Sequence, residues 1–162
     1  MPKTSSVDLT VFIEKFNQFN FAEHEVFHWS PKNNTIYYNL TEIAKESGIH
    51  QLLHELGHAI CNHTGYGSGI ELLKIEAEAW AKAEELAPEY GITIDQDKIE
   101  QCLDSYRDWL HARSTCPHCQ SVSIETNNNQ YHCFSCMQKW NVPADQRSRN
   151  YRLKTTRPFS IA

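Results

Sequence analysis

The chain has 162 residues, of which 40% are hydrophobic and 22% charged, and its net charge is −5. This length allows one compact domain with a small second module, and the composition is ordinary for a soluble globular protein. No apolar run approaches the ~18 residues that a membrane span needs, and Met1 to Val11 lacks the basic-then-apolar order of a secretory signal. We therefore expect a cytoplasmic protein with no membrane partner.

Local spacing predicts a helix and two strands in the first part of the chain. Apolar residues recur at helical spacing over 7–21, with Ser5 or Ser6 as a candidate cap. Strands are predicted at 26–29 and 35–38, the second of which is rich in β-branched and aromatic side chains. Turn-forming residues between the two strands indicate a β-hairpin.

Helices are expected to dominate the middle of the chain. A short helix is predicted at 41–47 and a longer, amphipathic one at 49–62, where apolar residues follow an i, i+3, i+4 pattern. A glycine-containing loop separates the second from a helix at 70–87, and a further helix is predicted at 95–112. Together with the strands, these elements predict an α+β fold that is mostly helical with a small β-sheet.

The helix predicted at 49–62 carries the motif His54-Glu55-Leu56-Gly57-His58. Residues four apart on a helix lie on the same face, so both histidines can direct a ring nitrogen at one metal ion. Glu55 lies beside them and can take a proton from a metal-bound water as that water attacks a carbonyl. Gly57 is costly inside a helix, which indicates that another helix or a substrate strand approaches closely there. The pattern predicts a catalytic zinc site with Glu55 as general base.

A catalytic zinc site usually has three protein ligands and one open position, so a third ligand is expected. The helix at 70–87 offers Glu76, which follows His58 by 18 residues and borders the apolar side of that helix. Glu78, two positions further along, is the alternative third ligand. The rival interpretation of the whole motif is an ordinary helix with two incidental histidines.

H-E-L-G-H followed by E-x-E-A-x-x-x-A resembles the ImmA/IrrE-type metallopeptidases of the gluzincin group. The resemblance covers about residues 35–87. It implies a minimal zincin domain, hydrolysis of peptide bonds and a zinc-binding glutamate on the second helix, here Glu76. The family usually has Asp or Asn four residues after that glutamate. This chain has Trp80 there, which offers no carboxylate to support a metal ligand.

The same resemblance points to groups that would act on the substrate. Gluzincins often use a nearby His or Tyr to stabilise the oxyanion, and His63 and Tyr66 are the main candidates, beside the tyrosines of the strand at 35–38. His63 follows the motif by five residues, which is expected to place it well around the helix from the metal-binding pair. By analogy, the strand at 35–38 is a candidate edge on which an extended peptide pairs.

Two C-x-x-C pairs, separated by 13 residues, follow the helical part: Cys116 and Cys119, then Cys133 and Cys136. Four thiolates at this spacing predict a closed, tetrahedral zinc site that is structural rather than catalytic. The chain between the pairs alternates like a small β-hairpin, and so short a module needs its metal in order to fold. It resembles a zinc ribbon. Cys61 and Cys102 lie in apolar helical segments and are expected to be buried, reduced thiols.

The predicted domains are a zincin-like metallopeptidase domain at 1–113, the zinc ribbon at 114–142 and a basic flexible tail at 143–162. An H-E-x-x-H domain joined to a ribbon is similar, in architecture only, to the SprT-like proteases. From Met137 onward 6 Lys and Arg oppose Asp145 alone, whereas the preceding chain has 9 Lys and Arg against 19 Asp and Glu. The basic tail favours an anionic partner, or it only keeps the protein in solution.

The ribbon carries three aromatic residues that form its small core or stack on bases: Tyr131, Phe134 and Trp140. These residues and the tail make nucleic acid, such as DNA, a candidate partner, with docking of a substrate protein and structural capping as the alternatives.

The sequence thus predicts a zinc metallopeptidase that acts on a protein or peptide and holds one catalytic and one structural Zn²⁺. Two alternatives remain. One is a nucleic-acid-binding or regulatory zinc-ribbon adaptor whose zincin-like domain is not catalytic. The other is a metal-dependent hydrolase of a non-peptide bond, because the motif specifies activated water rather than its target.

Overall fold

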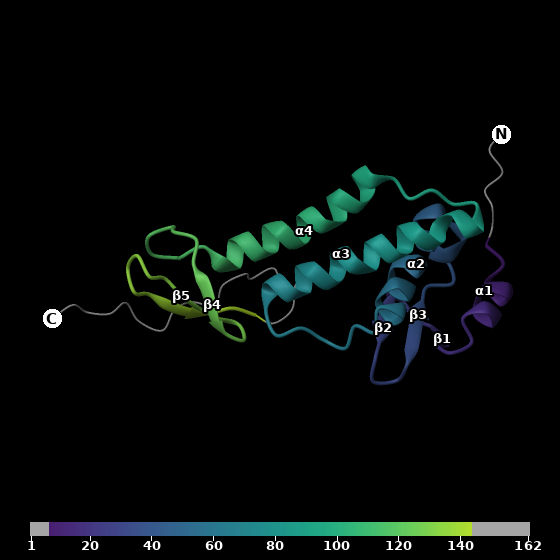
Figure 1. Cartoon of the computed structure of the whole chain (residues 1–162), viewed down its shortest axis with the longest axis horizontal. Coiled ribbons are helices and arrows are strands. Elements are labelled where there is room, and N and C mark those ends of the chain that lie inside the picture. The colour runs from purple at the N-terminus through teal and green to yellow at the C-terminus, as the bar shows by residue number, and fades with distance from the viewer. Residues whose placement is uncertain (1–6, 144–162) are drawn as a thin grey trace. The chain divides into compact units, whose positions relative to one another are not determined.

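The computed structural model describes residues 7–143 (Figure 1). Apart from Pro143, the tail predicted at 143–162 lies outside the described residues. Within 7–143 the fold class is α+β, as predicted, with four α-helices and two small three-stranded sheets. None of the described helices combines the length and apolar character that crossing a bilayer requires.

The chain divides into two compact units. Among the described residues, the first comprises 7–65 and 74–99, and the second comprises 66–73 and 100–143. The second unit is larger than the module predicted at 114–142, because it also contains most of the last helix and a segment before it. The assignment of 114–142 as a separate zinc-ribbon domain stays a prediction.

The first unit begins with helix α1, Leu9–Lys15, which is much shorter than the helix predicted at 7–21. Its cap is Asp8, whose carboxylate accepts hydrogen bonds from the main-chain N–H groups of Thr10 and Val11. The candidate caps Ser5 and Ser6 lie outside the described residues. The end of the predicted helix instead forms strand β1, Asn20–Glu23. Pairing with a distant strand overrides the helical spacing of the apolar residues here.

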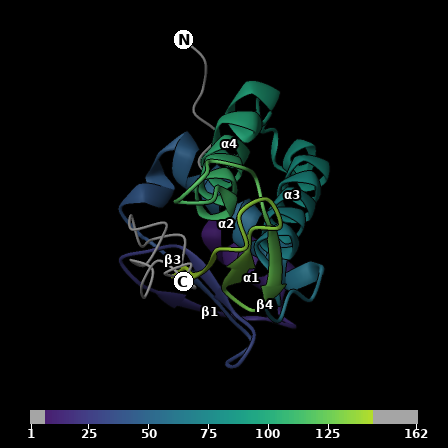
Figure 2. The same ribbon diagram turned by 90° about the vertical axis from the view of Figure 1, so that its left-hand side faces the viewer.

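The first sheet contains β1 and the predicted hairpin, formed by β2, His28–Ser30, and β3, Thr35–Tyr38. Its order is β1-β3-β2, with β1 parallel and β2 antiparallel to β3. The paired strands β1 and β3 lie next to each other, as Figure 2 shows. Because β3 is the central strand, the prediction that 35–38 is a free edge is wrong, and the edges are β1 and β2.

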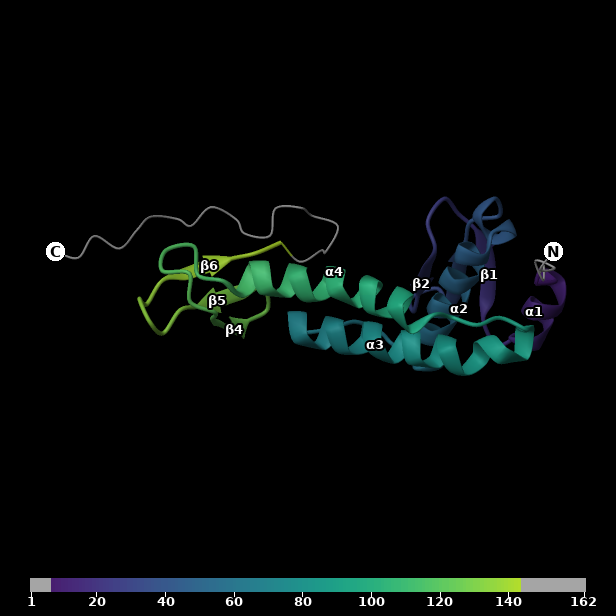
Figure 3. The ribbon, with the colours of Figure 1, turned by 90° about the horizontal axis from the view of Figure 1, so that it is seen from above.

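Helix α2, Glu46–Ile60, carries the H-E-x-x-H motif and packs on β2 and β3. Figure 3 shows α2 beside β2. It begins earlier than predicted, and the short helix expected at 41–47 is reduced to a 3₁₀ turn, Glu42–Ala44. Fully buried Ile36 of β3 and three leucines of α2, Leu52, Leu53 and Leu56, contribute to the core. This core fixes the helix by hydrophobic burial on the sheet.

Helix α3, Gly69–Leu86, and helix α4, Gln96–Ser114, are close to their predicted ranges. A 3₁₀ turn, Ala87–Tyr90, follows α3, and Gly91 behind it has a positive φ of 66°. A left-handed residue of this kind ends a helical segment at little cost when it is glycine.

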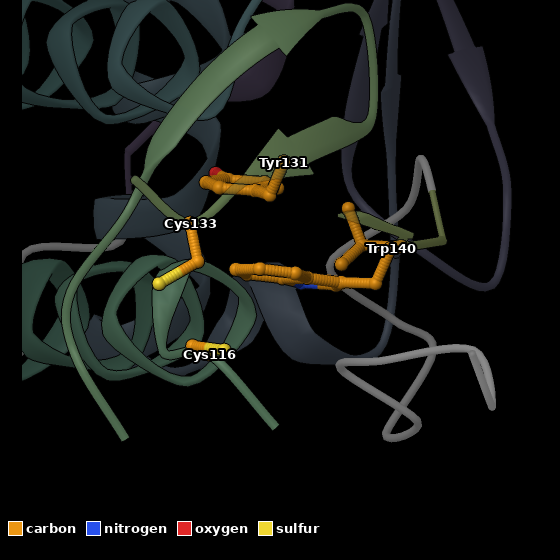
Figure 4. Packing of buried hydrophobic residues seen from close by; sticks show 5 residues of the cluster. Cys116, Tyr131, Cys133 and Trp140 are labelled. Atoms are coloured by element: carbon orange, nitrogen blue, oxygen red, sulfur yellow. The ribbon is translucent and has the colours of Figure 1, made fainter. Parts of the chain in front are cut away.

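The second sheet, of order β4-β5-β6, lies in the second unit. Strands β4, Ile124–Asn127, and β5, Gln130–His132, form the predicted hairpin, and β6, Lys139–Asn141, is an additional strand. Tyr131 of β5 and Trp140 of β6 are cross-strand partners, and their rings stack with centroids 5.6 Å apart, with Cys133 and Cys116 close by (Figure 4). Trp140 donates its indole N–H to the main-chain oxygen of Arg113, 3.0 Å away. The small sheet is thereby tied to the end of α4.

Candidate metal centres

The two histidines of the H-E-x-x-H motif point to one place beside α2. One helical turn separates His54 from His58, and their Nε2 atoms lie 3.1 Å apart. Both residues are buried: the exposed fraction is 5% for His54 and 7% for His58. The predicted i, i+4 arrangement of two ring nitrogens on one helix face is therefore present.

Glu76 of α3 completes this group. Its Oε2 atom lies 3.1 Å from Nε2 of His54, and its Oε1 atom lies 3.4 Å from Nε2 of His58. The three residues form a group whose possible ligand atoms all lie within 4.8 Å of one another. The structure thus brings together the two motif histidines and the first of the two glutamates that the sequence offered.

Gly57 explains how α3 comes so near to α2. A Cβ atom at this position would lie 2.3 Å from the main-chain oxygen of Ala79, a distance that no relaxed structure tolerates. Only glycine allows the two helices to touch here. The expectation that another element approaches Gly57 closely is confirmed, and this element is α3, which also carries Glu76.

The charge of Glu76 makes the group suited to a cation. Burial by itself raises the pKa of this carboxyl, but hydrogen bonds with His54 and His58 oppose burial and lower the pKa to about 2. A carboxylate is therefore held in an interior position beside two imidazoles. Two ring nitrogens and one carboxylate oxygen match the donor set of a three-ligand zinc site with an open fourth position.

Glu78, the alternative ligand, lies apart from this group. Its Oε2 atom is 3.0 Å from Nε2 of His63, and its Oε1 atom is 3.8 Å from Nζ of Lys74. The carboxylate is partly exposed, unlike that of Glu76. Its position favours contact with His63 over metal binding at the His54 and His58 pair.

Glu55, the predicted general base, is held by the first sheet. The main-chain N–H of Trp29 in β2 donates to Oε2 of Glu55 over 2.7 Å. This hydrogen bond fixes the orientation of the Glu55 carboxylate. Nothing in the sequence pointed to this contact, because it joins residues 26 positions apart through the packing of α2 on the edge strand.

His63 lies beside His58, contrary to the expectation that it points well around the helix. Their Nδ1 atoms are 2.9 Å apart. The helix ends at Ile60, and Asn62 has a positive φ of 55°, which turns the chain back. Tyr66, the other predicted stabiliser, belongs to the second unit. The oxyanion-binding role of either residue stays a prediction.

Trp80 occupies the position where the resembled family has Asp or Asn. Its indole stacks on the imidazole of His54, with ring centroids 4.2 Å apart and planes inclined by 27°. The Nδ1 atom of His54 is buried and has no hydrogen-bond partner among the described residues. At His54, the contact on this side of the ring is therefore stacking on Trp80 rather than a hydrogen bond to Nδ1.

The four cysteines of the two C-x-x-C pairs form a second group, also with ligand atoms within 4.8 Å. Sγ of Cys116 is 3.6 Å from Sγ of Cys136, and Sγ of Cys119 is 3.5 Å from Sγ of Cys133. No histidine belongs to this group, although His118 and His132 flank the pairs. Outside the group, Cys102 is half-buried and Cys61 is exposed, so the prediction that Cys61 is buried is wrong: it lies at the end of α2, where the helix meets solvent.

The thiols differ in acidity. A main-chain hydrogen bond from Cys136 lowers the pKa of the Cys133 thiol to about 6. For Cys136, the main-chain N–H of Gln138 favours the thiolate, but burial and the three neighbouring thiols outweigh this and raise its pKa to about 12. Four thiolates at this separation need a cation to offset their charge, as a structural metal does.

No family model matches the chain, and neither the curated proteins nor the solved structures contain a match to it. The resemblance to ImmA/IrrE-type metallopeptidases therefore stays a prediction from the motif. Inference about function rests on the two groups of side chains.

Proposed function

We propose that the chain is a zinc-dependent peptidase in which His54, His58 and Glu76 hold the catalytic ion. The observation that carries this proposal is the convergence of two imidazole nitrogens and one ionised carboxylate from two helices. A bound zinc ion would supply an activated water and polarise the carbonyl of a peptide bond. The donor set fits this ion and leaves a coordination position for the water.

Glu55 is the general base of the proposed reaction. Its Oε2 atom accepts the N–H of Trp29, which leaves Oε1 to take a proton from the attacking water and to pass it to the leaving amine. The fixed carboxylate does not have to be reoriented for this step, and such preorganisation lowers the barrier.

The four cysteines are proposed to hold a second, structural zinc ion. Four sulfur donors close the coordination shell, which leaves no position for a substrate. Zinc binds thiolates rather than disulfides, so this proposal implies a reducing compartment such as the cytoplasm.

A nucleic-acid-binding or regulatory adaptor is the second candidate function. Of the three aromatic residues considered for base stacking, only Phe134 has an exposed ring. Tyr131 and Trp140 are buried, whereas Phe134 is 62% exposed, although its ring contacts that of His132 with centroids 4.4 Å apart. An exposed aromatic ring is the kind of side chain that stacks on an unpaired base. Phe134→Ala would weaken binding of a single-stranded oligonucleotide in a fluorescence titration if this candidate is right.

Glu55→Gln tests the peptidase proposal. The amide retains an oxygen that accepts the N–H of Trp29, but it cannot take a proton. We expect full zinc content by elemental mass spectrometry and a loss of at least ~100-fold in cleavage of a proteome-derived peptide library. Glu46→Gln, the same exchange at an exposed site on α2, is the control and leaves cleavage unchanged. Undiminished cleavage by Glu55→Gln, or none by the zinc-loaded wild type, rejects the proposal.

A further inference from the structure

The end of α2 turns the chain so that His63 returns to the helix. Asn62 adopts the left-handed conformation, its N–H donates to the main-chain oxygen of Ala59, and the N–H of His63 donates to that of His58, 3.0 Å away. This pair of bonds is the Schellman arrangement that ends many helices. In addition, the indole N–H of Trp29 donates to the main-chain oxygen of His63 over 2.9 Å. The backbone of His63 is thus fixed from two sides.

The imidazole of His63 lies between a metal-ligand histidine and a carboxylate. Its Nδ1 atom is 2.9 Å from Nδ1 of His58, and its Nε2 atom is 3.0 Å from Oε2 of Glu78. The side chain of His63 is only 9% exposed, whereas that of Glu78 is 46% exposed. Both ring nitrogens of His63 therefore have a partner, and the ring has little freedom to rotate.

We propose that His63 and Glu78 form a hydrogen-bonded relay that orients His58 for metal binding. The inference rests on the proposed function only in taking Nε2 of His58 as a metal ligand. When Nε2 binds the ion, Nδ1 of His58 carries the ring proton and donates it to Nδ1 of His63. His63 then carries its own proton on Nε2 and donates it to the Glu78 carboxylate. Each donor meets an acceptor, so the relay has one consistent direction.

His63 is a positioning residue in this arrangement and not a fourth ligand. Its Nδ1 atom faces Nδ1 of His58, the nitrogen on the side of the ring away from the group formed with His54 and Glu76. The group of possible ligand atoms accordingly contains His54, His58 and Glu76 without His63. Histidine ligands are commonly fixed through their second nitrogen, and loss of such support typically weakens metal binding 10- to 100-fold.

His54, the other histidine of the group, lacks the support that the relay gives to His58. Nδ1 of His54 has no hydrogen-bond partner among the described residues, and the ring is held by stacking on Trp80. Of the two histidines in the group, His58 has a hydrogen-bond partner at both ring nitrogens among the described residues, whereas His54 has one at Nε2 alone. Glu78 does not belong to the group of possible metal ligands, and in this proposal it is the carboxylate at the outer end of the relay.

The test compares zinc affinities of the full chain carrying His63→Leu, His63→Asn or Glu78→Gln, by competition with a chromogenic chelator. Leucine removes the acceptor for Nδ1 of His58, and we expect affinity at the His54 and His58 site to fall 10- to 100-fold. Asparagine places its amide oxygen near the position of Nδ1, and it should retain affinity within about threefold of the wild type because the first hydrogen bond survives. Glu78→Gln should lower affinity less than His63→Leu.

Glu85→Gln is the matched control, because Glu85 is also a partly exposed glutamate of α3 with a lysine partner, Lys82, and it does not contact a histidine. Cobalt substitution separates the two metal sites, since only the cysteine site gives thiolate-to-cobalt charge-transfer bands. A changed ligand-field spectrum at the histidine site in His63→Leu, with a wild-type spectrum in His63→Asn, supports the relay.

Unchanged affinity in His63→Leu, or equal losses in His63→Leu and His63→Asn, overturns the relay while leaving the peptidase proposal intact. If the wild type binds zinc, and its zinc affinity falls in His63→Leu, but it cleaves no peptide, the relay proposal stands and the peptidase proposal is rejected. No zinc binding at the histidine site of the wild type rejects both.

Discussion

The two candidate metal centres differ in what surrounds their ligands. His54, His58 and Glu76 project from two long helices whose packing depends on a hydrophobic core of their own, including fully buried Leu52 and Leu56. In the second sheet and its surroundings, by contrast, Cys116 and Cys133 are themselves members of the five-residue buried cluster, together with Tyr131, Trp140 and Val142. One group of ligands is carried by a folded scaffold, and the other is part of the scaffold.

This difference determines whether the surrounding fold depends on the metal ion at each of the two candidate centres. A site on a preformed scaffold can lose its ion and keep its fold, so that the binding energy is available for orienting a reaction. A site that makes up much of a small core couples metal binding to folding, because too little apolar area is buried without it. The predictions below test this contrast.

Metal removal should give the largest effect. After treatment with a strong chelator, we expect the strands β4 to β6 to lose their structure and Trp140 to become exposed, while α2 and the first sheet remain folded. Amide spectra assigned to residues of each unit, together with tryptophan quenching, measure this. Cys116→Ser should reproduce the ribbon loss, and Cys61→Ser, outside the cluster, should not. Unfolding of the first unit on chelation would contradict the contrast.

Gly57→Ala should give the next largest effect, confined to the histidine centre. Helix propensity alone favours alanine by about 1 kcal/mol. The new Cβ would nevertheless meet main-chain atoms of Ala79, and overpacking of this kind typically costs about 1–3 kcal/mol. We expect a lower free energy of unfolding in urea and weaker zinc binding by His54, His58 and Glu76, with the cysteine site unchanged.

The control is Gly67→Ala, where the nearest atom to a new Cβ is the flexible carboxylate end of Glu71 rather than backbone. A gain in stability for Gly57→Ala would show that α3 does not approach α2 as closely as Ala79 indicates.

Local spacing was enough to predict most of the residues that form the two candidate metal centres. The i, i+4 histidines and the C-x-x-C pairs are brought together by helix geometry and tight turns, which depend on neighbours in sequence. Glu76 was predictable because its helix has a clear apolar side, and Gly57 signalled the close approach of that helix. The hairpin of β2 and β3 followed from its turn-forming residues.

What could not be predicted depends on contacts between distant parts of the chain. Strand β1 exists because it pairs with β3, although its first two residues fall within the helix predicted at 7–21. The bond from Trp29 to Glu55 likewise requires the sheet and helix to be in place. The predicted position of His63 is wrong for a local reason: the helix ends at Ile60 rather than at residue 62, and Asn62 adopts the left-handed conformation that turns the chain back.

Trp80 gives the smallest predicted effect, and it sharpens the contrast between the two ligand histidines. Trp80→Leu removes the ring that stacks on His54, whereas Trp80→Phe keeps an aromatic ring there. Stacked aromatic pairs contribute about 0.5–1.5 kcal/mol beyond burial, which corresponds to roughly 2- to 10-fold in zinc affinity. We expect Trp80→Leu to lose affinity within that range and Trp80→Phe to lose less, with chelator competition as the measurement and urea unfolding as the check on stability. Equal losses of zinc affinity in the two variants would mean that Trp80 acts by filling space. A loss in Trp80→Leu larger than that in His63→Leu would mean that stacking on His54, not the hydrogen bond at His58, is the main support of the site.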